Sequence, residues 1–287
     1  MPELLPVPED IVDDAHEAAL AAASASKVEM RVLESVEELS EVVDLCNEVW
    51  PGPQTEVSIG VLRMAASIGH FVSGAYDGDE LIGMCLGVFA APSGGPTHLH
   101  SHLAAVREGA RSRGIGFAVK MHQRAWALER GCHAITWTFD PQIGRNAYFN
   151  IERLGAKPSS FHLDFYGEQD NDWRSPSDRL MVTWALDGPL PRRTQGERDR
   201  LQAAPVLLSR GPDGEPVLHS APSSGPVLVY TPGELSQTLT SGPASARVWS
   251  HALRDTLGAM VGDGWETLGF TRSGAYCLRP PGGGTCS

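Results

Sequence analysis

Hydrophobic and polar residues alternate along the middle of the chain with two periods, one typical of helices and one typical of strands. Apolar side chains repeat at helical spacing over residues 36–49 and again in the run VSIGVLRMAASIG, residues 57–69, so two helices are predicted there. The β-rich runs HFVSGAYD and ELIGMCLGVFAA, joined by Asp77-Gly78-Asp79, predict a hairpin.

The pattern continues with regular elements up to residue 186. THLHSHLAAV, residues 97–106, predicts a strand, and apolar residues at helical spacing after it predict a helix that ends at Gly131. The strand HAITWTFD, the helix RNAYFNIERLG ending at Gly155, and the strands SFHLDFYG and RLMVTWAL follow. The chain therefore predicts a mixed α/β domain over residues 29–186.

The flanking regions have a different composition. Residues 1–28 combine prolines, acidic residues and an alanine tract, which predicts a mobile N-terminal tail with one loose helix. Pro/Gly-rich pieces over 187–226 predict a linker or a loosely packed insertion. Residues 227–287 predict a strand-helix-strand segment that packs on the first domain or on a partner subunit.

Charge and cysteine usage exclude several classes of protein. The 287 residues carry 23 Lys+Arg and 35 Asp+Glu, a formal charge of −12, which argues against nucleic-acid binding because that affinity comes from neutralising phosphates. The five cysteines are scattered and lack a C-x-x-C spacing, so neither a disulfide framework nor a zinc ribbon is indicated, and a cytoplasmic location is expected. No apolar run is long enough to cross a membrane.

Candidate chemistry gathers in SHLAAVREGARSRGIGFAVK, residues 101–120. Glycines at a strand-to-helix turn let backbone approach a ligand closely, and the free N–H groups of a helix start favour an anion. Residues 107–130 contain six Lys and Arg residues and two Glu residues, so their local net charge is 6 − 2 = +4. This charge either steers a small anionic ligand or belongs to a solvated helix face.

The sequence resembles the GNAT superfamily of acyl-CoA-dependent N-acyltransferases. The match is the pyrophosphate signature Q/R-x-x-G-x-G/A, which stands here as Arg111-Ser112-Arg113-Gly114-Ile115-Gly116 between a strand and a helix. The runs LHSHLAAV, ITWTFDP, RNAYFNIERLGA, DFYG and PSDRLMVTW, with ARVWSHALRDTL further on, look like an uncharacterised bacterial subgroup. The resemblance implies a mostly antiparallel sheet flanked by helices, with a smaller α+β C-terminal segment.

The resemblance also implies how acetyl-CoA, or another acyl-CoA, binds as the donor. Arg111, Arg113, Gly114, Ile115 and Gly116 would hold the diphosphate through main-chain N–H groups and the helix dipole. The strand that ends at Val106 would separate from the next strand, so that the pantetheine arm bonds the backbone of Ala104, Ala105 and Val106. Asn146 occupies the place of a family residue near the thiol. Helix-surface or capping amides are the alternative for Asn146 and Asn150, and for Asn150 this alternative is the preferred interpretation.

One position departs from the family pattern. Many members carry a tyrosine, four residues before the glycine that ends this helix, which protonates the departing thiolate, and this chain has Ile151 there. Tyr148 is a candidate substitute, as is Tyr166, but a buried tyrosine whose hydroxyl finds a partner is the commoner case.

The candidate base comes from the strand THLHSHL. Strand alternation places His98, His100 and His102 on one face. In the histone-acetylating branch of the superfamily, a base glutamate lies six residues before the apolar end of this strand. The same count from Val106 gives His100, and His102 is the second candidate. A histidine can take a proton from an amine near neutral pH. The H-x-H spacing also suits a metal ion, although acyl transfer from a thioester needs no metal. The third alternative is that these histidines only pack against their neighbours.

The predicted function is direct transfer of a small acyl group from acyl-CoA to a primary amine of a small molecule, without a covalent enzyme intermediate. The alternative is an acyl-CoA-binding or regulatory protein without turnover, which Ile151 motivates. No metal, nucleic acid or membrane partner is expected, and a homodimer is compatible with the sequence. Asp140, Asp178 and Arg179 are further polar residues, interpreted as acceptor-pocket residues, as a helix cap at Asp140, or as a surface ion pair between Asp178 and Arg179.

Overall fold

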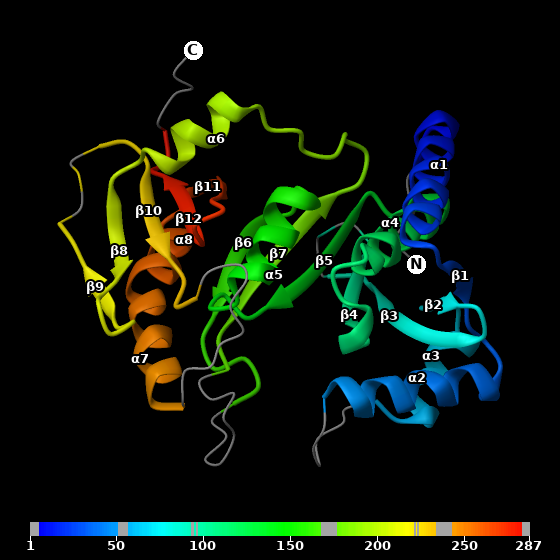
Figure 1. Cartoon of the computed structure of the whole chain (residues 1–287). Helices are drawn as coiled ribbons and strands as arrows, with labels where there is room; N and C mark the ends of the chain where they lie inside the picture. The colour runs from blue at the N-terminus through cyan, green and yellow to red at the C-terminus, as the bar shows by residue number, and fades with distance from the viewer. Residues whose placement is uncertain are drawn as a thin grey trace. The chain divides into compact units, whose positions relative to one another are not determined.

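The chain divides into two compact units. The computed structural model describes residues 6–50, 57–92, 95, 97–167, 177–220, 222, 224–233 and 243–282. The first unit holds residues 1–137 and 185–187, and the second holds residues 138–184 and 188–287. Figure 1 labels the helices and strands of both units. In the described part of the chain, no helix is long and apolar enough to cross a membrane.

A mostly antiparallel sheet forms the centre of the first unit. Its strands are β1 (Glu29–Val32), β2 (Phe71–Asp77), β3 (Glu80–Ala90), β4 (His98–Val106) and β5 (Ala134–Phe139). Neighbours pair antiparallel except β4 and β5, which are parallel. The hydrogen-bonding order continues beyond β5 with β7 (Arg179–Ala185) and β6 (Lys157–His162), and the chain passes from the first unit to the second within β5. The predicted mixed α/β architecture is confirmed.

The hairpin between β2 and β3 forms where its turn residues predict it. Asp77 lies opposite Glu80, and Gly78 has a φ of 63°, a left-handed conformation that a glycine adopts without steric strain. Most residues of β2 and β3 are buried because helices cover both faces of the sheet.

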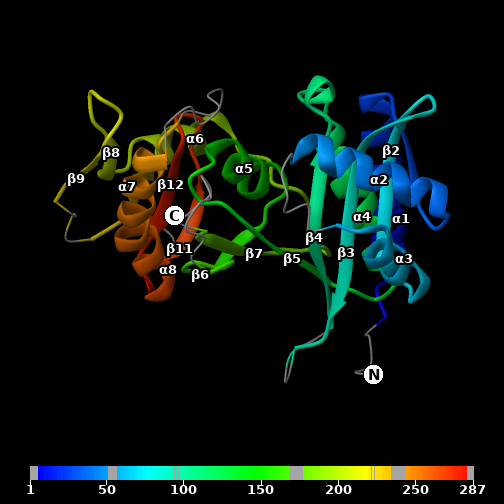
Figure 2. The same cartoon turned by 90° about the horizontal axis from the view of Figure 1, so that it is seen from below.

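The two faces of this sheet carry different helices. α2 (Val36–Val49) packs on β3 and β4, and α3 (Ile59–Ser67) packs on β2. α4 (Ile115–Glu129) packs on the opposite face, as Figure 2 shows. α2 begins where the sequence signals it, because Ser35 and Glu38 form a reciprocal capping box.

The N-terminal segment differs from the predicted loose tail. α1 (Glu9–Ser26) is an 18-residue helix that packs along α4, with Ala15, Ala19, Ala22 and Ala23 buried. Alanines at this spacing form a stripe of small side chains, which lets two helices approach closely. α1 is therefore a structural layer of the first unit, and residues 1–5 lie outside the described part.

The second unit contains a second, smaller sheet. Its five strands follow the order β11-β12-β10-β8-β9, with β11 (Glu266–Phe270), β12 (Ala275–Arg279), β10 (Val227–Tyr230), β8 (Val206–Arg210) and β9 (Pro216–Leu218). The helical elements are α5 (Gly144–Tyr148) with a π-helical turn at Phe149–Arg153, α6 (Gln195–Gln202), and α7 (Pro243–Leu253) continued by a π-helical turn at Arg254–Gly258 and by α8 (Ala259–Gly262).

Residues 187–226 are not only a linker. They supply α6, β8 and β9, and the buried side chains of Leu201 and Ala204 belong to a core cluster with Leu228 from β10. The Pro/Gly signals mark the turns between these short elements, such as Gly214 with a φ of 82° between β8 and β9. The regular elements were missed because each is too short to show a clear period.

The division into units does not coincide with the predicted domain boundaries. The predicted acyltransferase domain, 29–186, contributes to both units, and the segment 227–287 shares the second unit with residues 138–184. Whether residues 29–186 fold independently of the rest of the chain therefore stays a prediction.

Candidate functional site

The glycine loop forms a turn with two left-handed residues directly before α4. Ser112 has a φ of 68° and Gly114 a φ of 86°, and Gly114 is the N-cap of α4. Phe117 and Ala118 both donate their N–H to the carbonyl oxygen of Gly114, at 2.9 and 3.1 Å, so the helix ladder starts there. The N–H groups that precede this ladder at a helix start have no acceptor within the helix, and alternating φ signs turn successive N–H groups to one side, where they can bind an anion.

Two glycines keep this turn free of side chains for different reasons. A Cβ at Gly114 would lie 2.9 Å from Ser26 Oγ at the end of α1, in a backbone conformation that other residues rarely adopt. A Cβ at Gly116 would meet only Val106 Cγ2, at 3.9 Å. The loop therefore fits a close backbone approach by a diphosphate, with Gly114 required by the fold and Gly116 not.

The arginines near the loop already have acidic partners. Arg113 Nη2 lies 2.8 Å from Asp77 Oδ2, and Arg111 Nη1 lies 3.8 Å from Glu108 Oε1. Both pairs are largely exposed, so each contributes about 0–1 kcal/mol and can open to meet an anion. Arg107 is held more firmly, because it pairs with both Glu48 and Glu80.

β4 changes its pairing halfway along its length. Leu99 lies opposite Ile135 and His100 opposite Thr136 in the parallel ladder with β5. On the β3 side the register skips His102, which makes His102 the extra residue of a β-bulge. A bulge bends and twists its strand, so β4 changes direction at His102, two residues after its last pair with β5.

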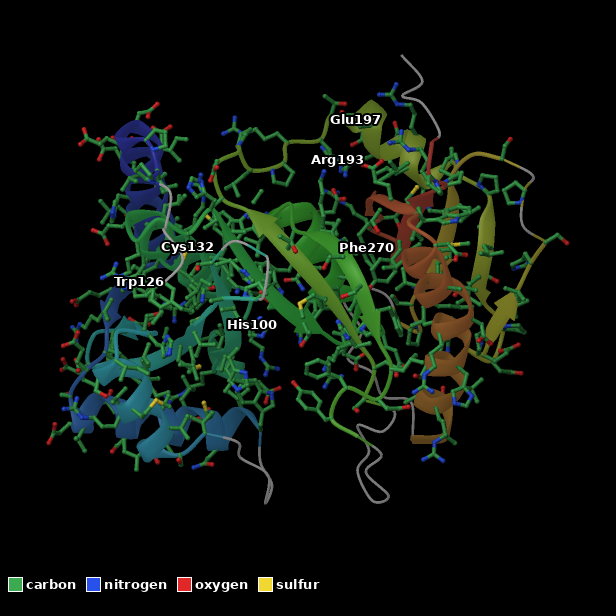
Figure 3. All side chains as sticks on the ribbon, turned by 180° about the vertical axis from the view of Figure 1, so that it is seen from behind. His100, Trp126, Cys132, Arg193, Glu197 and Phe270 are labelled. Carbon is green, nitrogen blue, oxygen red and sulfur yellow. The ribbon has the colours of Figure 1, made fainter. Side chains whose placement is uncertain are left out.

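The candidate bases on β4 lie in different environments. His100 is half-buried, its Nδ1 lies 3.0 Å from Thr136 Oγ1, and burial lowers its pKa, with a further decrease from the neighbouring His102, His98 and Lys120. Figure 3 marks His100 among the side chains. His102 at the bulge is exposed. A neutral His100 can accept a proton, so His100 stays a candidate base.

Sequence reasoning missed a buried polar cluster between α4 and the sheet. Lys120, which is 5% exposed, donates to Ser101 Oγ at 2.8 Å and to Gln123 Oε1 at 2.9 Å, and its Nζ lies 4.2 Å from the centre of the Trp137 ring. Gln123 Nε2 donates in turn to Cys85 Sγ at 3.1 Å. Burial lowers the pKa of Lys120 to about 8.

The positive charges of α4 are therefore not a solvated helix face. Arg124 is also buried, and its guanidinium donates twice to the carbonyl oxygen of Leu186, at 2.9 and 2.6 Å. The signal available in the sequence was polar residues at 120, 123 and 124 within an otherwise apolar helix, but only the packing of α4 on the sheet and of α1 on α4 removes them from water.

The remaining predicted site residues belong to the second unit. Asn146 and Tyr148, both half-buried, lie on α5, and Ile151 is buried in the π-helical turn that follows. Asn150 is buried as well, which is at odds with the interpretation as a surface amide. Gly155 ends the segment with a φ of 78°, as predicted.

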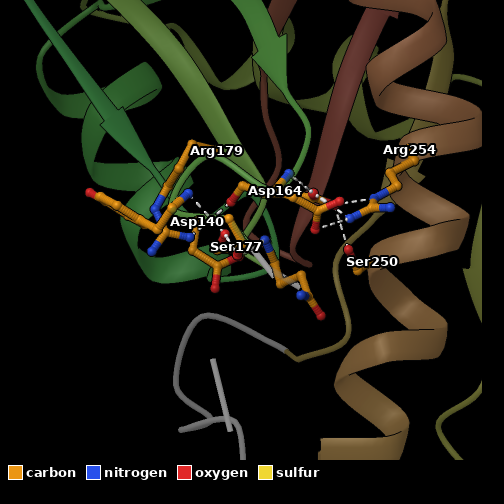
Figure 4. Close-up of polar contacts among 10 residues, drawn as sticks. Asp140, Asp164, Ser177, Arg179, Ser250 and Arg254 are labelled. Atoms are coloured by element: carbon orange, nitrogen blue, oxygen red, sulfur yellow. Dashed lines mark hydrogen bonds and ion pairs between the residues drawn. The ribbon is translucent and has the colours of Figure 1, made fainter. Parts of the chain in front are cut away.

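Asp178 does not form a surface ion pair with Arg179. Its carboxylate, 3% exposed, accepts from Arg254 Nε and Nη2, both at 2.7 Å, and from Ser250 Oγ at 2.5 Å. These bonds hold its pKa below the usual range, although burial acts in the opposite direction. Figure 4 shows Arg254 and Ser250 reaching this site from α7 and the turn after it.

Asp140 acts as the turn cap that one interpretation expects. Its Oδ1 accepts from the backbone N–H of Gln142 at 2.9 Å, and burial raises its pKa. In the described residues, no group of three or more His, Cys, Asp or Glu side chains is arranged to hold a metal ion.

The glycine loop, the bulged strand and α4 lie within a region that a known family shares. Residues 37–156 match the model of the Acetyltransferase (GNAT) family, so this part of the chain is similar to that family. This match covers less than half of the chain. The family match supports acyl transfer as the general class of reaction.

Solved structures of acetyltransferases resemble about half of the chain at low similarity. The acetyltransferase of the GNAT family from Streptococcus pneumoniae is 9% identical over 55% of this chain and 98% of its own (TM-score 0.45), and the ribosomal-protein-S18-alanine N-acetyltransferase from Escherichia coli is 11% identical over 58% and 99% (0.46). Chaetomium thermophilum Naa20, in complex with a bisubstrate analogue, is 20% identical over 55% and 86% (0.44). These values do not identify an activity. No curated protein sequence matches the chain.

Proposed function

We propose that the protein is an acyl-CoA-dependent N-acyltransferase that moves a small acyl group, acetyl first among them, to the primary amine of a small molecule. The observation that carries the proposal is the turn before α4, where Gly114 caps the helix within the family-matched residues. Its free N–H groups, with the dipole of α4 behind them, suit a diphosphate. Arg111 and Arg113 would exchange their carboxylate partners for phosphate oxygens.

The pantetheine arm would follow β4 beyond its ladder with β5. The ladder stops after His100, and Ala104 and Val106 keep exposed or half-exposed positions on the strand. Backbone groups on the β5 side of residues 104–106 would bond the arm and align the thioester. His100 would take the proton of the amine, with His102 as the more exposed alternative, and direct transfer then needs no covalent intermediate.

Asn146 and Tyr148 remain part of the proposal. Asn146 would contact the cofactor near the thiol, and Tyr148 is a candidate proton donor, in the segment where Ile151 replaces the expected tyrosine. The second candidate function, acyl-CoA binding without turnover, rests on Ile151. Both functions use the same loop, so a binding measurement and a turnover measurement separate them.

A Gly116→Val variant tests the diphosphate site, because the signature allows only glycine or alanine at this position. The Cβ position has room in the fold, since its nearest neighbour is 3.9 Å away, but the branched side chain would lie at the turn that we assign to phosphate. We expect coenzyme A affinity, measured by calorimetry, to fall at least about tenfold, which is about 1.4 kcal/mol. Gly109→Val is the matched control, since nothing lies within 4 Å of its Cβ position. Equal affinity in both variants and the wild type would contradict the assignment.

Turnover is tested by thiol release. Several acyl-CoA donors are crossed with amino acids, polyamines and aminoglycosides, and the best pair then serves for His100→Ala, His102→Ala and Tyr148→Phe. Full turnover of His100→Ala would exclude His100 as the base. Coenzyme A binding without thiol release for any pair would favour the non-catalytic alternative.

A further inference from the structure

The buried ammonium of Lys120 lies where β4 and β5 stop pairing. The last pair of the parallel ladder is His100 with Thr136, and the next residue of each strand is Ser101 and Trp137. Both of these residues contact Lys120 Nζ, one by a 2.8 Å hydrogen bond and the other through its ring at 4.2 Å. A positive charge therefore marks the closed end of the separation between the two strands.

Within the described residues, no carboxylate lies within ion-pair distance of this ammonium. Its three N–H groups meet the Ser101 hydroxyl, the Gln123 carbonyl and the face of Trp137, which are all neutral groups. A buried cation held only by neutral groups is costly for folding, and it is well placed to stabilise negative charge that arrives later. This arrangement is more than packing requires, since an apolar side chain would fill the same space.

In the part of the chain that the structure describes, Lys120 affects the pKa of two titratable groups, Cys85 from β3 and His100 from β4. On the α1 side of α4, burial lowers the pKa of both His122 and Arg124; the charge of His16 lowers that of His122 further, and the charge of Asp14 opposes the decrease at Arg124. The facing residue of β2, Phe71, packs on the His122 ring, and the β5 contact is Trp137.

We infer that Lys120 supplies the proton that the departing coenzyme A thiolate takes up, acting through the hydroxyl of Ser101. The inference rests on the proposed acyl-CoA function and adds a proton source in a chain where Ile151 stands in place of the family tyrosine. The lowered pKa of Lys120, about 8, suits transfer to a thiolate, because a thiol ionises near 8.5.

The proposed step transfers the acyl group from sulfur to the acceptor nitrogen and protonates the sulfur. The acceptor nitrogen forms a bond to the acyl carbon, the carbon–sulfur bond breaks, and its electron pair leaves on sulfur. Ser101 gives its hydroxyl proton to sulfur while the Lys120 ammonium gives a proton to Ser101 Oγ. The products are the amide, free thiol and a neutral Lys120, which recovers its proton from the one that the acceptor amine releases to His100 or water.

A turnover-independent experiment comes first. Coenzyme A is bound to the wild type and to Lys120→Met, and ionisation of the bound thiol is followed across pH by the ultraviolet absorbance of the thiolate. We expect the wild type to lower the pKa of the bound thiol and the variant to lose that shift. Equal titration in both proteins would overturn the inference and leave the proposed function standing, whereas absence of coenzyme A binding by the wild type would refute the proposed function itself.

The pH profile of kcat is the second readout. We expect wild-type kcat to fall as pH rises through about 8, the pKa of Lys120, and Lys120→Met to lose this limb together with about 100-fold in kcat, the range typical of a general acid. Ser101→Ala, a smaller change that keeps the charge, should lower kcat with the donor KM unchanged, and it carries the test if Lys120→Met does not fold. Cys85→Ala is the control and should keep the alkaline limb. A profile that depends on Cys85 and not on Lys120 would overturn the inference.

Discussion

At the scale of single residues, the functional loop depends on one glycine that the backbone itself requires. Gly114 has a φ of 86°, and an added Cβ would also approach Ser26 Oγ to 2.9 Å. We expect Gly114→Ala to lower the free energy of unfolding by about 1–2 kcal/mol, chiefly through the strained left-handed conformation. Urea unfolding measures this change.

The double variant Gly114→Ala, Ser26→Ala separates the two causes. Removing the Ser26 hydroxyl relieves the contact and leaves the backbone strain, so only a small part of the stability should return. Full recovery in the double variant would show that the contact, not the φ angle, makes this position glycine.

Lys120 makes stability depend on pH in a defined direction. Its pKa is about 8 in the folded state and near 10.5 in the unfolded chain, so between these values the unfolded chain binds the extra proton and stability rises with pH. We expect Lys120→Met to remove this rise from the pH dependence of urea unfolding between pH 8 and 10.5. Lys157→Met, at an exposed position, should keep the wild-type slope.

At the scale of elements, α1 is the layer that encloses α4. Ala15 is 1% exposed against α4, whereas Ala21 on the same helix is exposed. Ala15→Glu places a charge in this interface and should lower stability by about 3 kcal/mol or more, while Ala21→Glu should change it by less than about 0.5 kcal/mol. Equal unfolding midpoints for the two variants would contradict the packing of α1.

Element types were predictable where the pattern was long or where a turn residue enforced it. The capping box of Ser35 and Glu38 and the Gly78 turn are local chemistry, so α2 and the β2–β3 hairpin follow from a few neighbouring residues. The two strands and one helix within 187–226 were not predictable, since strands of three and five residues carry no clear period and obtain their stability from neighbours in the second sheet.

At the scale of the whole molecule, ion pairs join segments that are distant in sequence. Arg254 binds both Asp178 and Asp164, 76 and 90 residues away along the chain. We expect Arg254→Met to cost about 3–5 kcal/mol in the stability of the second unit, because it leaves the Asp178 carboxylate buried without its cation.

A double variant that also removes the Asp178 charge shows whether the loss of stability in Arg254→Met comes from the unpaired carboxylate. Asp178→Asn combined with Arg254→Met should be less destabilising than Arg254→Met alone, since no uncompensated charge remains. The lowered pKa of Asp178 also predicts that the stability it contributes is present at neutral pH and is lost as pH falls through its folded pKa, and the double variant should lack that loss. Additive losses in the double variant would show that the pair is not coupled.

The same contacts bear on the predicted domain boundary. A fragment ending at residue 186 would keep Asp178 and Asp164 but lose Arg254, Ser250 and the smaller sheet. The described residues of the segment 227–287 thus contribute to the second unit together with residues 138–184.

The sequence by itself determined the mixed α/β class, the order of elements through residue 186 and the glycine turn before α4, because these depend on periodicity and on the conformational freedom of single glycines. Only the tertiary structure decided that α1 closes over α4, that Lys120 is buried beside Ser101 and Trp137, and that Asp178 pairs with Arg254. The reason is physical: burial and charge pairing depend on which distant segments exclude water from a side chain, and no local pattern carries that information.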